Sequence, residues 1–222
     1  MLELISFMVL ALVLGFKHSY DADHIIAVSN ILRKIKTISS ALKIGFSWAI
    51  GHMITATIIT ILLFIFRKSA LNFILPHFEK IVGFMLIFLG ILSLKDIFLL
   101  HKHKHKHGRI VHSHIHLHYN ALGQEDYNSH KHMFGIGIIH GLASNDELLI
   151  LFTTSLGITT IGGIILGIGF FSLGVVLGMT IFCAILSLTF LKIHREKIHK
   201  IFSLLTGSIS IIYGTLMIFQ LI

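Results

Sequence analysis

The sequence has few of the residue types that stabilise small soluble domains. It contains one Cys and one Pro in 222 residues, and only 13% of its residues are charged. A single Cys excludes a disulfide framework and a metal site built from several thiolates. About a quarter of the residues of an ordinary soluble domain are charged, so most of this protein's exterior cannot face water. With 55% hydrophobic residues and a mean hydropathy of +0.88, the composition predicts a protein of the lipid bilayer.

Long stretches with few charged side chains predict an all-α integral membrane protein with six transmembrane helices. A helix needs about 20 predominantly apolar residues to cross the hydrocarbon core. The predicted spans occupy residues 2–31, 44–66, 79–100, 133–156, the later part of the uncharged stretch 148–191, and 201–222. The glycine-bearing segment at residues 157–163 predicts the turn between the fourth and fifth spans. A secretory signal at the N-terminus is disfavoured, because Glu3 stands where such a signal carries positive charge.

Positive charge predicts the orientation of these spans. Lys and Arg are concentrated after the first, third and fifth spans, whereas the turn between the fourth and fifth spans has no charge. Cytoplasmic loops carry an excess of Lys and Arg, so these three connections are expected in the cytoplasm. Both termini are then expected outside.

A weak internal repeat relates the two halves of the chain. Residues 15–25 and 137–147 both place a Gly, then a His three residues later, then an acid or amide cluster, at an offset of 122. Residues 48–51 match residues 171–174 at an offset of 123, and two glycine pairs match at an offset of 124: Gly83 with Gly207, and Gly90 with Gly214. Two copies of a three-span unit have opposite orientations, so the pattern predicts inverted repeats of the kind found in secondary transporters. The predicted organisation is repeat 1 at residues 1–100, a His-rich loop at 101–132 and repeat 2 at 133–222.

The first span contains an unusual cluster of ionisable residues: Lys17, His18, Asp21, Asp23 and His24. Each costs about 2.5–3.5 kcal/mol to insert, and such residues usually mark ion or substrate pathways. A regular helix would place His18, Asp21 and His24 on one side, whereas bringing Asp23 to the same ion as the two histidines requires local unwinding. Imidazole and carboxylate without thiolate suit Ni, Co, Zn, Mn or Fe rather than Cu(I).

Two other spans contain further candidate ligands. His52 lies in the uncharged second span, where it is either a metal ligand or a hydrogen-bonded packing residue. His140 and Glu147 are seven residues apart in the fourth span and share a helix face, with Asp146 beside Glu147. One interpretation is that His140, Asp146 and Glu147 form the second half of the ion pathway. The alternative is that Asp146 and Glu147 form an interfacial cluster at the membrane edge.

The loop at residues 101–132 holds ten of the 17 His. Its composition predicts a mobile tract that binds transition metal at the cytoplasmic mouth, where a cytoplasmic metal chaperone would be a partner. The alternative is a solvated linker whose Lys and His only enforce its cytoplasmic placement. Nucleic-acid binding is not expected, because the basic residues have no interleaved aromatics.

The segment HSYDADHIIAVSN at residues 18–30 resembles the His-x4-Asp-His signature of the nickel/cobalt transporter family. The segments at residues 48–59 and 171–179 are also similar to helices of that family. The resemblance implies metal contacts from His18, Asp23 and His24, a selectivity role for His52, and pathway roles for His140, Asp146 and Glu147. It also implies a multi-pass protein of a prokaryotic cytoplasmic membrane.

The leading hypothesis is a secondary transporter that moves Ni²⁺ or Co²⁺ through the bilayer, with uptake favoured and with no catalytic residue or resident cofactor. The chain has no GxxxxGK[ST] loop, so it contains no recognisable ATPase domain. The alternatives are an efflux permease with the same site, a membrane metalloenzyme with a di-iron or haem centre, and a proton-coupled antiporter using Asp21 and Asp23.

Overall fold

The computed structural model describes residues 2–32, 35, 37–65, 75–107, 110–117, 129–142, 161–192 and 196–221. Within these ranges the chain forms seven helices and two strands. The elements are α1 (Leu2–His18), α2 (Ala22–Leu32), α3 (Ile38–Ile65), α4 (Leu75–Leu99), β1 (Leu100–His107), β2 (Ile110–Leu117), α5 (Ser129–His140), α7 (Ile161–Lys192) and α8 (Glu196–Ile218).

Four helices are long and apolar enough to cross a membrane. These candidate spans are Ile38–Leu62 in α3, His77–Lys95 in α4, Ile165–Phe190 in α7 and Ile198–Ile218 in α8. Helices α1 and α2 meet the same criteria as a pair bent by 54°, so together they can form a fifth span. The helical membrane architecture predicted from composition is therefore confirmed, while the predicted number of six spans is not.

The predicted fourth span lies only partly within the described residues. Helix α5 begins at Ser129, four residues before the predicted start at residue 133, and ends at His140. Residues 143–160 lie outside the described residues, and they include the end of the predicted fourth span and most of the predicted turn at 157–163. The last three residues of that segment belong to α7, which begins at Ile161, and so they are helical.

The exterior of the bundle is apolar, as expected for a surface that faces lipid. Large side chains such as Phe84 on α4 and Ile165 on α7 are more than 60% exposed. A soluble protein does not expose apolar side chains on this scale, because each would leave apolar area in water. The buried core instead contains Trp48, Phe171 and Leu86 together with several polar side chains.

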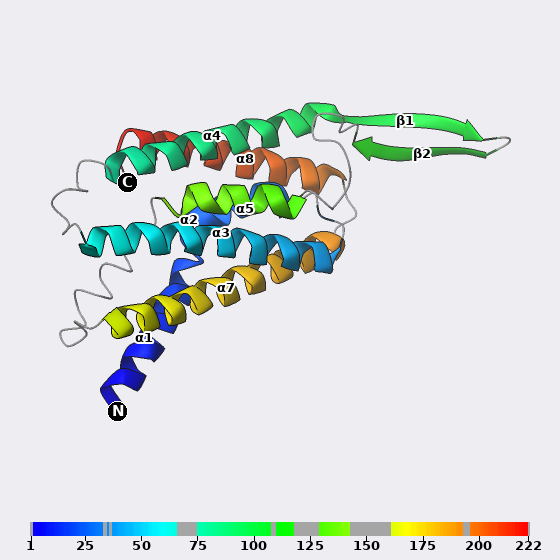
Figure 1. The fold of residues 1–222 in the computed structure, drawn as a ribbon. Helices are drawn as coiled ribbons and strands as arrows, with labels where there is room; N and C mark the ends of the chain where they lie inside the picture. Colours follow the sequence, from blue (N-terminus) through cyan, green and yellow to red (C-terminus); the bar gives the residue numbers. More distant parts are fainter. Residues whose placement is uncertain are drawn as a thin grey trace.

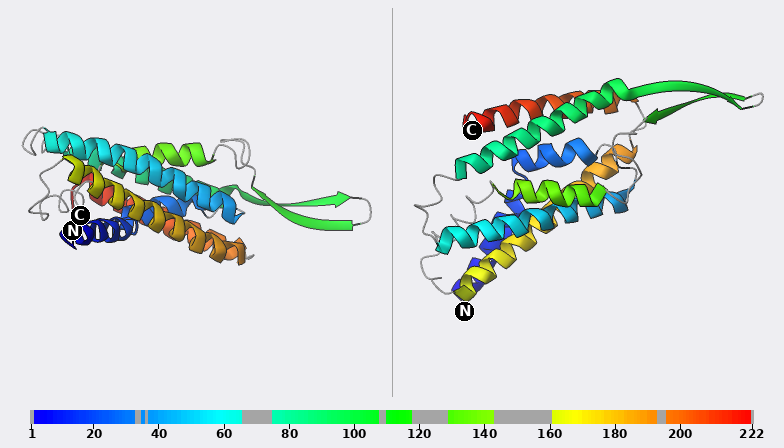
Figure 2. Two further views of the ribbon diagram at one scale, coloured as in Figure 1. Left: turned by 60° about the horizontal axis from the view of Figure 1, so that its bottom comes forward. Right: turned by 45° about the horizontal axis from the view of Figure 1, so that its top comes forward.

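The helices lie side by side, with α2 enclosed among them (Figure 1, Figure 2). Helix α1 packs on α7, α3 packs on α5 and α7, and α4 packs on α8. The short helix α2 contacts α3, α4, α7 and α8. The strands extend from one end of the bundle, where α3 and α8 also begin, and both chain termini lie at the opposite end (Figure 1). This agrees with the expectation that the basic connections share one side.

Glycines allow the backbones of packed helices to approach closely. A Cβ atom at Gly15 on α1 would clash with the backbone of Phe171 on α7, and a Cβ atom at Gly137 on α5 would clash with the carbonyl of Trp48 on α3. Small residues at such contacts are the usual way in which membrane helices pack, because lipid supplies no hydrophobic force to join them.

These glycine contacts correspond to one another at the offsets seen in the sequence. Adding 122 to Gly15 gives Gly137, and subtracting 123 from Phe171 gives Trp48, so the contact of α1 with α7 corresponds to that of α5 with α3. The same offsets relate three further pairs of contacts, namely Gly174–Leu12 with Gly51–Phe134, Gly178–Ser19 with Thr55–Gly141, and Gly83–Gly214 with Gly207–Gly90.

The first part of the His-rich segment forms an antiparallel hairpin of β1 and β2, whereas residues 118–128 lie outside the described residues. The register pairs His101 with His116, His103 with His114 and His105 with His112. Successive positions of a strand alternate between the two faces, and directly paired positions share a face. The six histidine positions therefore share one face of the hairpin. The alternation of His with Lys has the two-residue period of a strand, which explains why an extended structure forms here.

Candidate metal site

A break between α1 and α2 positions the site. Helix α1 ends at His18, a turn follows at Ser19 and Tyr20, and α2 begins at Ala22. The amide of Asp21 donates a hydrogen bond to the His18 carbonyl, and the Ser19 hydroxyl donates to the Phe16 carbonyl. The helix is therefore interrupted between His18 and Asp23, as one ion shared by His18, Asp23 and His24 would require, but the close ligand atoms place His18 and Asp23 in different groups. Interrupted helices of this kind occur at the ion sites of secondary transporters.

His24 lies at the centre of a buried cluster of aromatic rings. Its ring centroid lies 4.7 Å from that of His18, 4.9 Å from His52 and 5.0 Å from both His140 and Trp48. Each of the four histidines is at most 2% exposed. The cluster combines the end of α1, the start of α2, the middle of α3 and the end of α5.

Nitrogen and oxygen atoms of the cluster lie close enough to share an ion. His18 Nε2 is 3.3 Å from His52 Nε2, and His140 Nε2 is 3.1 Å from Asp23 Oδ2. Three imidazoles, from His18, His24 and His52, bring one ligand atom each within 4.8 Å of one another. Asp23, His24 and His140 do the same.

Asp21 lies at the edge of this cluster. Its Oδ2 atom is 2.8 Å from His18 Nδ1, and its side chain is 30% exposed, compared with 14% for Asp23. Asp21 belongs to neither of the two ligand groups within the described residues. A carboxylate on the second nitrogen of a ligating histidine orients the ring and fixes its tautomer. In this geometry Asp21 positions His18.

His52 and Trp48 lie one turn apart on α3, and their rings stack with centroids 4.9 Å apart and an interplanar angle of 16°. Among the described residues, His52 Nδ1 is buried without a hydrogen-bond partner. The sequence did not identify Trp48 as a site residue, because a single Trp in an apolar span is typical of a core residue. Its spacing of four from His52 was the available signal.

The aromatic neighbours of His18 and His140 are also related by the offsets of the internal repeat. The ring of Phe171 lies 5.5 Å from that of His18, and the ring of Trp48 lies 5.5 Å from that of His140. His18 and His140 differ by 122 positions and Trp48 and Phe171 by 123.

Of the remaining predicted ligands, Asp146 and Glu147 lie outside the described residues.

Apolar spanning helices around a buried cluster of imidazoles and carboxylate define a multi-pass membrane protein with a candidate transition-metal site. The chain is 32% identical over 213 residues to the urease accessory protein UreH of Bacillus sp. (strain TB-90), across 96% of this chain and 90% of UreH. It therefore belongs to the UreH family.

A shorter match joins the chain to a second protein. This chain is 35% identical over 95 residues to the nickel transporter NixA of Staphylococcus aureus (strain NCTC 8325 / PS 47), across 39% of this chain and 28% of NixA. No protein-family model and no solved structure match the chain. The two relatives support the resemblance to nickel/cobalt transporters, and the expectation that the chain is not an enzyme agrees with their descriptions as an accessory protein and a transporter.

Proposed function

We propose that the protein is a secondary transporter of Ni²⁺ or Co²⁺ and that the buried cluster around His24 binds the transported ion. The observation that supports this most strongly is the convergence of four buried imidazoles and the Asp23 carboxylate at a helix break. Such groups are costly within a membrane and are usually functional. Imidazole nitrogen is a favoured ligand for these metals, and NixA is named a nickel transporter.

The proposed mechanism is alternating access between two inverted halves. The matched contacts of α1 with α7 and of α3 with α5 support two related three-helix units, with His18 and His140 as corresponding residues. Rocking of two such units about a central site is the common transporter mechanism. Helix α2, which contributes Asp23 and His24, lies inside the bundle, as this mechanism requires for a central site.

The proposed direction is uptake across a cytoplasmic membrane, with both termini outside and the hairpin in the cytoplasm. The excess of Lys and Arg in the connections at the hairpin end supports this orientation. An inward-negative potential favours entry of a divalent ion by about 2.3 kcal/mol per charge per 100 mV. Efflux through the same site is the alternative.

Transport in sealed vesicles tests the function and the direction together. Protein reconstituted in one known orientation is expected to move ⁶³Ni²⁺ or Co²⁺ down an imposed gradient and faster under an inward-negative potential. Protein-free vesicles are the control. Absence of metal flux under every gradient would contradict the proposal, and a pH-sensitive dye in the same vesicles tests proton coupling.

We further propose that the hairpin binds metal on its histidine face. The register pairs three histidines of β1 directly with three histidines of β2. Replacing these six histidines with Asn is expected to remove at most three bound Ni²⁺ per chain, one for each pair, in equilibrium dialysis at pH 7.5. Binding is expected to fall at pH 5, because protonated imidazole cannot ligate metal.

Replacing Lys102, Lys104 and Lys106 with Asn is the matched control, because these positions alternate with the histidines on β1. This variant is expected to keep the full number of bound ions. An equal loss from both variants would indicate that the hairpin structure, rather than its histidines, determines binding.

A further inference from the structure

The ligand atoms of the buried cluster form two groups that share His24. We call His18, His24 and His52 the three-histidine position, and Asp23, His24 and His140 the aspartate position. We propose that the transported ion occupies these positions alternately and keeps His24 as a ligand in both. This inference rests on the proposed function and adds how the ion is held within the site.

Both positions already have spacings suited to an ion. At a metal–nitrogen bond of about 2.0–2.1 Å, two nitrogens of a tetrahedral site lie about 3.3 Å apart. His18 Nε2 and His52 Nε2 are separated by 3.3 Å, and His140 Nε2 and Asp23 Oδ2 by 3.1 Å. In each position one pair of ligand atoms therefore already has the spacing of a metal site, and the third ligand atom lies within 4.8 Å of both.

His24 can serve only one position at a time. Its Nδ1 atom lies 2.9 Å from the His18 carbonyl oxygen, which only accepts hydrogen bonds, so Nδ1 donates its proton there. With Nδ1 protonated in this way, the ring lone pair lies on Nε2, so His24 can ligate a metal through one nitrogen only. Two divalent ions a few ångströms apart in a low-dielectric interior would also repel each other strongly. An ion that moves between the positions exchanges His18 and His52 for Asp23 and His140 while it remains on His24.

The two positions differ in chemistry. The three-histidine position offers only imidazole nitrogen, which suits Ni, Co and Zn and is poor for Mg²⁺ or Mn²⁺. The aspartate position adds a carboxylate, whose charge stabilises any divalent ion and whose oxygen also suits Mn²⁺. This difference agrees with the selectivity role that the resemblance to nickel/cobalt transporters implies for His52, and it assigns retention of the ion to Asp23.

The two positions also come from different helices. The three-histidine position is built from α1, α2 and α3, whereas the aspartate position joins α2 to α5 through His140. A displacement of α5 relative to α2 would therefore separate the ligands of the aspartate position and leave the other ligand set intact. This gives one position that can open while the other stays formed.

Cobalt binding to the purified full-length protein in detergent tests the shared ligand. The number of Co²⁺ ions bound by the His24→Ala variant is subtracted from each measurement. This corrects for any Co²⁺ that the hairpin binds. Wild type is expected to bind one additional Co²⁺ per chain. His52→Ala and Asp23→Asn are each expected to bind one as well, with visible absorption bands that differ, because one retains the aspartate position and the other the three-histidine position.

Two additional ions in wild type, or loss of the ion from either single variant, would overturn the proposal. His52→Gln keeps more of the side-chain volume and replaces His52→Ala if the latter does not fold, as judged by thermal unfolding and elution volume. Absence of flux through wild-type vesicles despite this binding pattern would refute the proposed transport function and leave the two positions intact.

Competition in vesicles tests selection. His52→Ala is expected to raise the ratio of Mn²⁺ to Ni²⁺ transport by at least about tenfold, because the nitrogen-only ligand set is lost. Asp23→Asn is expected to slow transport of both metals and to keep the wild-type ratio. A ratio that changes with Asp23 and not with His52 would contradict the different chemistry of the two positions and overturn the proposal.

Discussion

Replacing His24 with Ala is expected to reduce metal transport more than any other single substitution in the cluster. His24 is a member of both ligand groups and lies within about 5 Å, centroid to centroid, of His18, His52 and His140. Loss of an outer-sphere partner of a metal ligand already costs about 10–100-fold in affinity or activity. Loss of the shared ligand is therefore expected to lower the initial rate of ⁶³Ni²⁺ transport in vesicles by more than about 100-fold.

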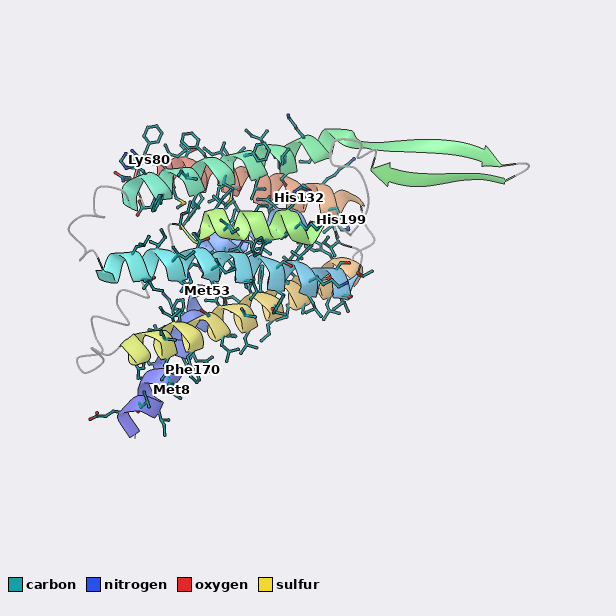
Figure 3. The ribbon with its side chains drawn as sticks, in the orientation of Figure 1. Met8, Met53, Lys80, His132, Phe170 and His199 are labelled. Atoms are coloured by element: carbon teal, nitrogen blue, oxygen red, sulfur yellow. The ribbon has the colours of Figure 1, made fainter. Side chains whose placement is uncertain are left out.

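His132→Ala is the matched control for this experiment. His132 lies on α5, eight residues before His140, and is exposed near the hairpin end of the bundle (Figure 3). The same chemical change is made there outside the buried cluster, so transport is expected within about twofold of wild type, as for most surface substitutions. Transport by His24→Ala at the level of His132→Ala would refute the cluster as the transport site.

The sequence singles out Asp23 and His24, because the cost of burying charge limits the explanations for these two residues within an apolar span, and the structure brings them together with other histidines. A break near His18 was needed only if one ion contacts His18, Asp23 and His24 together; the structure has the break but divides these residues between two ligand groups. His140 was found through its correspondence with His18 at the offset of 122. In each case a sequence pattern, either local or repeated at a fixed offset, contained the necessary information.

Other features of the site depend on contacts between distant segments. The separation of His18 and Asp23 into different ligand groups follows from where α3 and α5 place His52 and His140. The role of Trp48 follows from its stacking on His52 and its contact with His140, neither of which composition predicts. The hairpin register likewise depends on pairing between β1 and β2, whereas its composition alone suggested a mobile tract.

Replacing Gly137 with Ala is expected to destabilise the protein strongly. A Cβ atom there would overlap the Trp48 carbonyl, so α5 would have to move away from α3. Overpacking usually costs about 1–3 kcal/mol, and the upper end applies because backbone rather than a flexible side chain must shift. Thermal unfolding in detergent is expected to show a Tm lowered by about 6–12 °C. Movement of α5 would also displace His140 from Asp23, so metal transport should fall together with stability.

Gly135→Ala is the matched control, since Gly135 lies on the same helix and a Cβ atom there would meet no atom of the described residues within 4 Å. Ala in place of Gly in a helix is expected to raise stability by about 0.5–1 kcal/mol, so this variant should unfold at or above the wild-type Tm. Gly15→Ala makes the corresponding clash between α1 and Phe171. If the halves are related as proposed, Gly15→Ala and Gly137→Ala should lower the Tm by similar amounts. A loss confined to one of them would argue that the two contacts are not equivalent parts of a repeat.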